Sequence, residues 1–352
     1  MTKPIDARYD IVYFFDITDG NPNGDPDAGN LPRLDPETGQ GLVTDVCLKR
    51  KIRNYVELAG AGKPGLRVFV REGAILNRQI EEAYDQSEEV KQALEQWLKY
   101  EAAKKNKKLK EKPTQPTQHY EDIARRWMCD QFFDVRAFGA VMTTGKEKSA
   151  GSADEDEGAE TSRAPSKIRR TAGQVRGPVQ FGLARSIHRI FSQEHALTVC
   201  AARMEEKPYE NQVGIQGRKF TVPYALYRVH GYINPNLGAG PNGTGFSEDD
   251  LALLKRALDQ MFEFDKSAAR ADMRPVACVA FRHESPLGNA RADQLFARVA
   301  CKPKPGVQPL PGEAGGEASD ARPPRSFADY ELTVNEAELP AGVTVERWIG
   351  WT

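Results

Sequence analysis

The stretch that decides the fold is RYDIVYFFDIT at residues 8–18, and the loop DGNPNGDPDAGNLPRLDPETGQG follows it directly at residues 19–41. In the first stretch the odd-numbered apolar residues share one side of an extended chain, while Val12 and Phe14 lie on the other. This alternation predicts a strand that is buried on at least one face. The many Gly, Pro, Asn and Asp residues of the second stretch predict a long loop built from turns.

A helix is predicted immediately after this loop, over residues 45–59. Thr44 can cap its N-terminus, and Asp45 lies in the first turn, where a negative charge is favourable. One face of the helical wheel is apolar and consists of Leu48, Ile52, Tyr55, Val56 and Ala59. The residues beside that face are basic: Lys49, Arg50 and Arg53. The helix is therefore expected to pack by one face and to present positive charge.

The rest of the chain alternates between strand patterns, helix patterns and segments that fit neither. The strand-like runs occupy residues 179–187, 196–202, 222–233 and 275–281. A further helix begins after Ser247. Residues 60–175 do not continue the pattern and are interpreted as an insertion, with a helix at residues 88–110 that ends in a dense run of lysines. Without the insertion the order is strand, helix, strands, helix, strand, which predicts an α+β fold with a ferredoxin-like sheet and helices on one face.

Composition excludes several classes of protein. Among 352 residues, Lys and Arg number 49 and Asp and Glu number 50, so the chain is not a nucleic-acid binder that is basic all over. No apolar run approaches the roughly 18–20 residues of a membrane span, and the N-terminal residues lack the features of a signal peptide. Five cysteines without a C-x-x-C pair indicate neither a disulfide framework nor a zinc site. We therefore expect a cytoplasmic protein with reduced thiols and no membrane partner.

The loop after the first strand is rich in carboxylates. It matches the first half of a calcium-binding loop, but the twelfth position counted from Asp19 holds Asn30 where a bidentate glutamate is needed. A magnesium-dependent nuclease could use such carboxylates, which here are Asp16, Asp19, Asp25 and Asp27. Aspartates in turns more commonly accept backbone N–H bonds. Spacing identifies no distant ligand, so no metal and no cofactor is expected, and the structural and nuclease interpretations both stay open.

Positive charge is concentrated in one part of the chain. The residues from Arg163 to Arg189 include no Asp or Glu. The basic residues there are Arg163, Lys167, Arg169, Arg170, Arg176, Arg185 and Arg189. Together with the basic side chains of the helix at residues 45–59, they predict a lining suited to phosphate groups. A solvated surface with paired charges is the alternative.

Arg136 opens a run, RAFGAV, that matches part of the first signature of RNA-recognition motifs. The run keeps an arginine, a phenylalanine, a glycine and a valine, but it lacks the second aromatic residue that stacks on a base. On its own it also describes a buried strand, and both interpretations stay open.

Four segments carry a more specific signal. They are FFDITDGNPNGDPDAGNLPRLDPETGQGLVTDVCLKRKIRNYV at residues 14–56, DVRAFGAVM at 134–142, GQVRGPVQFGLARSI at 173–187 and GRKFTVPYALYRVHGYI at 217–233. These segments resemble the backbone subunits of type I-C CRISPR Cascade complexes, which belong to the RAMP superfamily. The resemblance implies several copies that polymerise head to tail along one CRISPR RNA and present it to target DNA in antiviral defence. It also implies contacts with other Cascade subunits and no catalysis by this subunit.

The same resemblance implies an organisation into palm, fingers and thumb. The palm, similar to an RNA-recognition motif, comprises residues 1–59 and 176–300 and carries a thumb hairpin at about residues 204–223. The inserted fingers are residues 60–175. Composition, and not the resemblance, predicts a mobile acidic loop within them at about 149–162, and a linker with a C-terminal strand and tail at 301–352.

Site residues follow from the basic segments and the resemblance together. Those expected to contact RNA are Asn21, Asn23, Lys49, Arg50, Arg53, Arg136, Arg169, Arg170, Gln174, Arg176, Met204, Arg218 and Lys219. Four lysines of the insertion are expected either to touch target DNA or to end a solvated helix: Lys104, Lys105, Lys107 and Lys108. Related subunits of type III complexes cut RNA with a loop aspartate. A metal-dependent ribonuclease that uses the Asp-rich loop is therefore the alternative function.

Overall fold

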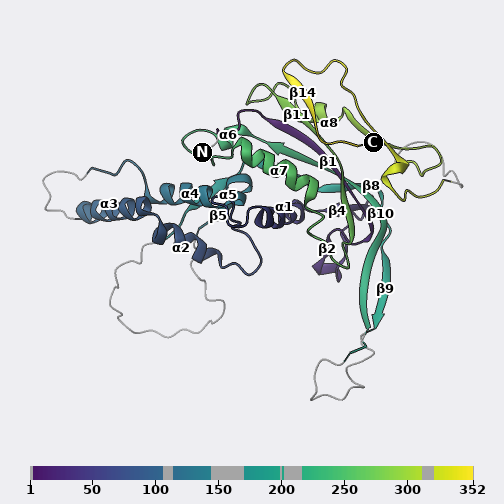
Figure 1. Cartoon of the computed structure of the whole chain (residues 1–352), viewed down its shortest axis with the longest axis horizontal. Coiled ribbons are helices and arrows are strands. Elements are labelled where there is room, and N and C mark those ends of the chain that lie inside the picture. The colour runs from purple at the N-terminus through teal and green to yellow at the C-terminus, as the bar shows by residue number, and fades with distance from the viewer. Residues whose placement is uncertain are drawn as a thin grey trace. The chain divides into compact units, whose positions relative to one another are not determined.

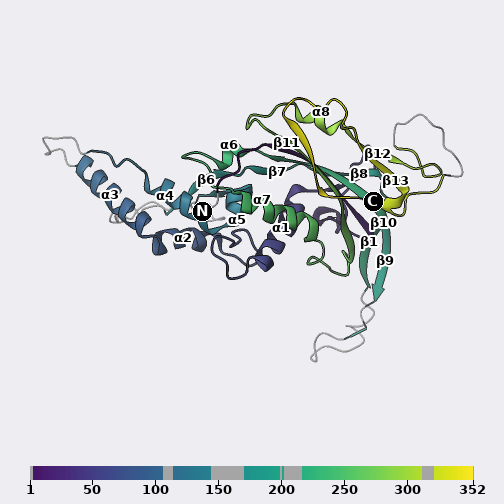
Figure 2. The ribbon, with the colours of Figure 1, turned by 45° about the horizontal axis from the view of Figure 1, so that its top comes forward.

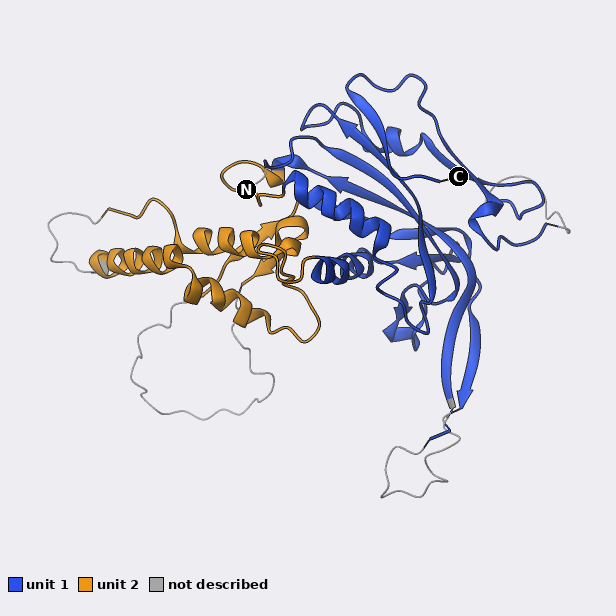
Figure 3. Cartoon of the chain, in the orientation of Figure 1, with its two compact units in different colours: residues 1–59, 179–236, 247–352 blue, residues 60–178, 237–246 orange. Residues whose placement is uncertain are grey.

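The chain folds into two compact units, which Figure 3 shows in different colours. Unit 1 comprises residues 1–59, 179–236 and 247–352, and unit 2 comprises residues 60–178 and 237–246. The computed structural model describes residues 3–105, 114–143, 170–198, 200–201, 216–310 and 321–351. The predicted α+β class is confirmed in its coarse form, because helices accompany a large antiparallel sheet.

Unit 1 is built on an eight-stranded sheet with the order β14-β11-β1-β10-β8-β4, in which β7 and β9 pair with other parts of β10 (Figure 1). Its strands are β1 (Tyr9–Gly20), β4 (Gln40–Val43), β7 (Val179–Phe181), β8 (Ala184–Arg189), β9 (Gln193–Thr198), β10 (Gln216–Ile233), β11 (Asp272–His283) and β14 (Val343–Ile349). The strand predicted from residues 8–18 is β1, and it pairs with β10 on one side and with β11 on the other.

Two helices, α1 (Asp45–Ala59) and α7 (Glu248–Gln260), cover one face of this sheet (Figure 1). The odd-numbered residues of β1 point toward them: the Tyr13 hydroxyl donates to the Leu258 carbonyl oxygen at 2.9 Å, and the Phe15 ring lies 5.5 Å from the Phe262 ring. The Tyr55 hydroxyl donates to Gln260 Oε1 at 2.8 Å and so ties α1 to α7. The helix predicted over residues 45–59 is confirmed with the same bounds.

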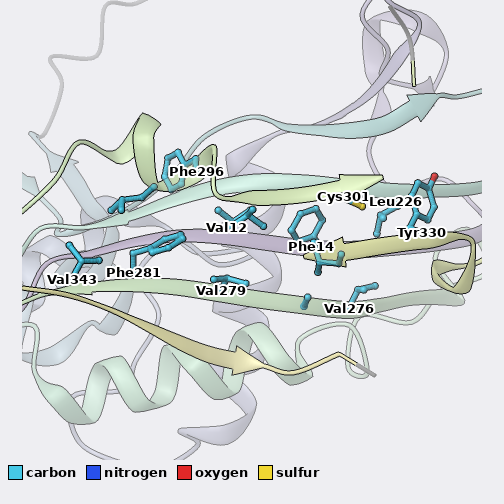
Figure 4. Close-up of a cluster of buried hydrophobic side chains, with 14 of the residues drawn as sticks. Val12, Phe14, Leu226, Val276, Val279, Phe281, Phe296, Cys301, Tyr330 and Val343 are labelled. Carbon is cyan, nitrogen blue, oxygen red and sulfur yellow. The ribbon is translucent and has the colours of Figure 1, made fainter. Parts of the chain in front are cut away.

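The opposite face of the sheet is covered by a layer whose packing the sequence patterns did not predict. This C-terminal layer consists of α8 (Ala292–Phe296), β12 (Val299–Pro303) and β13 (Tyr330–Val334). Figure 4 shows Phe296, Cys301 and Tyr330 of the layer packed against Val12 and Phe14 of β1. As a result every residue of β1 from Tyr9 to Ile17 is buried.

A histidine holds the C-terminal layer against the sheet. His188 in β8 bonds through Nδ1 to the Tyr330 hydroxyl at 2.9 Å and through Nε2 to the Gln308 carbonyl oxygen at 2.7 Å. Strands β12 and β13 therefore pack with the sheet, and β14 forms its edge beside β11.

The charged residues of β1 are paired within this doubly covered sheet. Asp16 accepts hydrogen bonds from Arg274 Nε at 2.9 Å, from Arg274 Nη2 at 3.0 Å and from the Tyr224 hydroxyl at 3.1 Å. Asp10 bonds to His283 Nε2 and to the Arg8 guanidinium, each at 3.0 Å. A buried carboxylate is tolerated only when such partners replace its water.

Unit 2 is mainly helical and has its own core. Its elements are α2 (Leu76–Gln86), α3 (Glu88–Lys105), α4 (Tyr120–Gln131), α5 (Phe133–Phe138), β5 (Gly139–Met142) and β6 (Gly173–Arg176). Phe69, Ile80, Met128 and Phe132 are among the residues of that core. The helix predicted over residues 88–110 is α3, described as far as Lys105, and the five residues after it lie outside the described residues.

One element of unit 2 differs from its sequence interpretation. The run from Arg136 to Phe138 was open to a buried strand, but it forms the last turn of α5, and the strand begins only at Gly139. Gly139 has φ 82°, and a Cβ there would lie 2.4 Å from the Val175 carbonyl oxygen. The glycine lets the chain turn from helix into hairpin, which a short apolar run does not reveal.

The remaining elements are short. They are β2 (Gly24–Asp25), η1 (Pro26–Ala28), β3 (Leu31–Pro32), α6 (Pro235–Gly238) and η3 (Phe327–Asp329). In the described part of the chain, every helix is either too short or too polar to cross a membrane.

We predict that Arg274→Met lowers the free energy of unfolding by about 2 kcal/mol, because Asp16 then keeps a buried charge with only the Tyr224 hydroxyl as its partner. Urea denaturation measures this change. The control is Lys3→Ala, which removes an exposed pair with Asp6 and is expected to cost at most about 0.5 kcal/mol. Equal effects of the two substitutions would contradict the assigned role of Arg274.

Candidate nucleic-acid interface

The basic side chains of α1 occupy different environments. Lys49 Nζ bonds to Asp45 Oδ2 and to Gln180 Oε1, each at 3.0 Å, and its side chain is only 13% exposed. Arg50 is exposed and Arg53 is half-buried. Lys51, which the sequence interpretation did not single out, is buried and forms an ion pair with Asp265. The outward charge of α1 therefore comes mainly from the two arginines.

The two asparagines predicted to contact RNA hold the loop before α1 in shape. Asn23 Oδ1 accepts hydrogen bonds from Thr44 N at 3.0 Å and from Thr44 Oγ1 at 3.1 Å. Asn21 is buried, and its Nδ2 donates to the Asn30 carbonyl oxygen at 2.8 Å. Thr44 Oγ1 also accepts from Cys47 N at 3.2 Å, as the predicted cap requires. These bonds fix the loop beside the N-terminus of α1.

Two of the four aspartates considered as nuclease ligands, Asp16 and Asp25, have structural partners. Asp25 caps η1 by accepting from Asp27 N at 3.2 Å, and it lies 3.4 Å from Arg33 Nη2. Asp16 is buried in β1 with Arg274, as described above. Among the described residues, no three His, Cys, Asp or Glu side chains are grouped so that they could hold a metal ion. The arrangement supports the structural interpretation of the loop.

Several predicted contacts lie in unit 2. The Arg136 guanidinium is buried and donates to the Cys129 carbonyl oxygen at 2.6 Å and to the Gly65 carbonyl oxygen at 3.0 Å. Arg170 is exposed and pairs with Asp85 at 2.9 Å. Gln174 and Arg176 are exposed on the same side of β6. The sequence-predicted residues are thus divided between the two units, and Arg136 has a structural role in its own unit.

The predicted thumb, about residues 204–223, is described only from residue 216 onward, where it forms one strand of a two-stranded ribbon. β9 pairs with the first part of β10, and Figure 2 shows this ribbon extending beyond the rest of the sheet. All residues of β9 are exposed, and Arg218 pairs with Glu194 at 3.2 Å. Residues 216–223, predicted as part of the hairpin between two strands, belong to β10 itself and include Lys219. Met204 lies outside the described residues.

The lysine-rich end of the insertion is described only in part. Lys104 is exposed on α3, and its Nζ lies 5.8 Å from the centre of the Tyr100 ring. The side chain of Lys105 and the whole of Lys107, Lys108 and Arg169 lie outside the described residues, as does the acidic loop at 149–162.

A cleft in unit 1 contains functional groups that the sequence interpretation missed. This β8–β10 cleft has a volume of about 800 Å³, and β8, β10, α8 and β12 contribute to its walls. Its polar and aromatic lining includes Arg185, Arg228, His230, Tyr232, Asp293 and Phe296. The alternation in residues 228–232 placed three of these side chains on one face of a strand. Phe296, which contacts them, comes from a distant segment, so no local sequence pattern could group these four residues into one site.

Aromatic rings meet in this cleft. The His230 ring stacks on the Phe296 ring with centroids 4.1 Å apart, and the Tyr232 ring meets Phe296 edge-on at 5.7 Å. Arg228 Nη2 donates to the Phe296 carbonyl oxygen at 2.8 Å. Burial, together with the positive charge of Arg228, lowers the pKa of His230 to about 4. The imidazole is therefore neutral near pH 7.

We predict that His230 makes the protein less stable in mild acid. In the unfolded chain this imidazole takes up a proton below about pH 6.5, whereas in the folded chain its pKa is about 4. The stabilisation is therefore complete above about pH 6.5 and is lost as the pH falls toward about 4. Urea denaturation at about pH 7 and about pH 5 should show a smaller loss for His230→Phe than for the wild type. An equal loss would contradict the lowered pKa.

Comparisons with known proteins agree on one family. The family model described as "CRISPR-associated protein Cas7" matches residues 7–335. The curated "CRISPR-associated protein Cas7" of Haloferax volcanii is 48% identical over 50 residues, which are 14% of this chain. The match spans only 15% of the length of that relative.

Two solved structures were also found to be similar. A chain of a "CRISPR RNA-guided surveillance complex, pre-nicking" is 16% identical, with a TM-score of 0.40 over 78% of each chain. A chain of a "CRISPR RNA-guided surveillance complex" is 14% identical, with a TM-score of 0.33 over 88% of this chain and 78% of that one.

Proposed function

The chain belongs to the Cas7 family of CRISPR-associated proteins, and on that premise we propose that it is a non-catalytic backbone subunit that binds CRISPR RNA. The four segments quoted above further favour a type I-C Cascade complex. The observation that carries the proposal is that unit 1 contains both a basic helix, α1, and an exposed two-stranded ribbon formed by β9 and β10. A helix that presents arginines suits the phosphates of a single strand.

The proposed palm is similar to an RNA-recognition motif. The order β1, α1, β8, β10, α7, β11 follows the β-α-β-β-α-β sequence of such domains. In that motif bases stack on aromatic residues of the open sheet face. Here the C-terminal layer covers the corresponding face around β1. We therefore place the guide against α1, its preceding loop and the ribbon, where contacts go to the sugar-phosphate backbone.

The ribbon is proposed to act as the thumb. One of its strands is β10 itself, which continues into the centre of the sheet beside β1. On this proposal the predicted thumb residues between the two strands, about 204–215, insert between bases at a cost of a few kcal/mol, which phosphate contacts from residues such as Arg218 and Lys219 offset. Copies of the subunit then follow one another head to tail along the guide, which pairs with target DNA, and other Cascade subunits complete the assembly.

Catalysis is not part of the proposal. A ribonuclease of the alternative kind needs carboxylates that converge on an ion. In the described residues Asp16 instead forms a buried ion pair with Arg274, and Asp25 caps η1. These observations favour the scaffold over the metal-dependent ribonuclease.

We predict that binding is led by phosphate contacts and depends strongly on salt. Log affinity for a single strand falls with log salt concentration by about 0.7 for each phosphate that is neutralised. Replacing both Arg50 and Arg53 by Ala should reduce that slope by about 1.4 and weaken binding to RNAs of unrelated sequence equally. Fluorescence anisotropy over a range of salt concentrations measures both quantities.

The matched control is Arg256→Ala, which removes an exposed positive charge from α7. Its salt slope should equal that of the wild type. If the double substitution in α1 leaves both the affinity and the slope unchanged, α1 is not the RNA contact.

A further inference from the structure

The β8–β10 cleft lies on the face of the sheet opposite α1. His230 in β10 lies directly opposite Val12 in β1, and cross-strand neighbours point to the same face of a sheet. Val12 packs with the residues of the C-terminal layer, so His230 lies on that face. The helix α1 covers the other face through Tyr55 and α7. We propose that this cleft binds a nucleotide, holding its phosphate with arginines and its base with aromatic rings, as a second site that does not depend on the proposed contact at α1.

Charge in the cleft favours an anion. Arg228 and Arg185 are direct cross-strand neighbours on β10 and β8, where like charges repel. Arg185 has a carboxylate partner, Asp35, at 2.6 Å. Among the described residues, Arg228 has no carboxylate partner and makes one hydrogen bond, to the Phe296 carbonyl oxygen. A bound phosphate supplies the negative charge that this partly buried guanidinium lacks.

The rings beside these arginines suit a nucleobase. Tyr232 and Phe296 both line the cleft, Tyr232 is 39% exposed, and its ring meets the Phe296 ring edge-on. Sequence-tolerant stacking on aromatic rings is a common way to hold a base. Asp293 lines the same cleft and can accept a hydrogen bond from a base amino group, although it also pairs with Arg291 at 2.9 Å. Its carboxylate belongs to α8, whereas the two arginines belong to β8 and β10.

The neutral state of His230 fits this assignment. Because its pKa is about 4, the ring adds no charge near pH 7 and remains a flat surface stacked on Phe296. Its Nε2 is buried and has no hydrogen-bond partner among the described residues. A volume of about 800 Å³ lies within the range of small-ligand sites, roughly 300–1,000 Å³. The cleft therefore accommodates a single nucleotide.

The test is a titration of the full chain with AMP, GMP, CMP and UMP, together with photo-cross-linking to an RNA that contains 4-thiouridine. If the nucleotide is free, at least one monophosphate binds and its nucleoside binds at least about fivefold more weakly. If the nucleotide belongs to an RNA strand, cross-links form within residues 228–233 or 293–301. Either result supports the proposal and identifies the source of the nucleotide.

Variants separate the cleft from the rest of the surface. Tyr232→Ala and Arg228→Gln should each weaken the binding, or reduce the cross-link, at least about tenfold, whereas Tyr232→Phe keeps the ring and should stay within about twofold. The control Phe191→Ala removes a ring that is 72% exposed and lies outside the cleft. Its binding should match that of the wild type.

Tyr232 is partly exposed, so its substitution tests the cleft even if Arg228→Gln fails to fold. The proposal is overturned if no monophosphate binds and no cross-link forms in these segments, or if Tyr232→Ala changes neither signal. A failure of the proposed α1 contact would appear instead as an unchanged salt slope when Arg50 and Arg53 are replaced, so the two proposals can fail independently.

Discussion

The burial of β1 on both faces is the constraint on which the rest of unit 1 depends. Helices α1 and α7 cover its odd-numbered residues, and the C-terminal layer covers Val12 and Phe14. Each fully buried aromatic side chain contributes roughly 1.5–3 kcal/mol, so the three layers stabilise one another. The centre of the sheet is then covered on both sides, and the surfaces proposed for binding lie at α1, at the ribbon of β9 and β10, and at the β8–β10 cleft.

Because β1 is buried on both faces, its carboxylates must find partners within the protein. A carboxylate on a doubly covered strand must have a partner, and Asp16 has Arg274 while Asp10 has Arg8 and His283. An aspartate held in this way is neutralised by its neighbour and contributes to folding. Sequence spacing alone cannot distinguish such an aspartate from a metal ligand, because the partner comes from a distant strand.

Local patterns predicted the parts of the fold that local physics determines. The alternation around Val12 predicted β1, and the cap and apolar face predicted α1 with the same bounds. The packing of the C-terminal layer could not be predicted, because its strands β12 and β13 are separated by a segment rich in Pro and Gly and meet only against the sheet. The run that begins at Arg136 forms a helical turn, which a short apolar run does not distinguish from a strand. The cleft depends on Phe296 meeting His230, which is a tertiary contact.

The central claim is that this subunit forms a backbone whose length is set by RNA, and sedimentation of the full chain with RNAs of increasing length tests it most directly. A head-to-tail interface that does not close into a ring grows as long as its template allows. The account predicts that the mass of the complex rises in regular steps as the RNA is lengthened. A fixed number of copies on every RNA would contradict it.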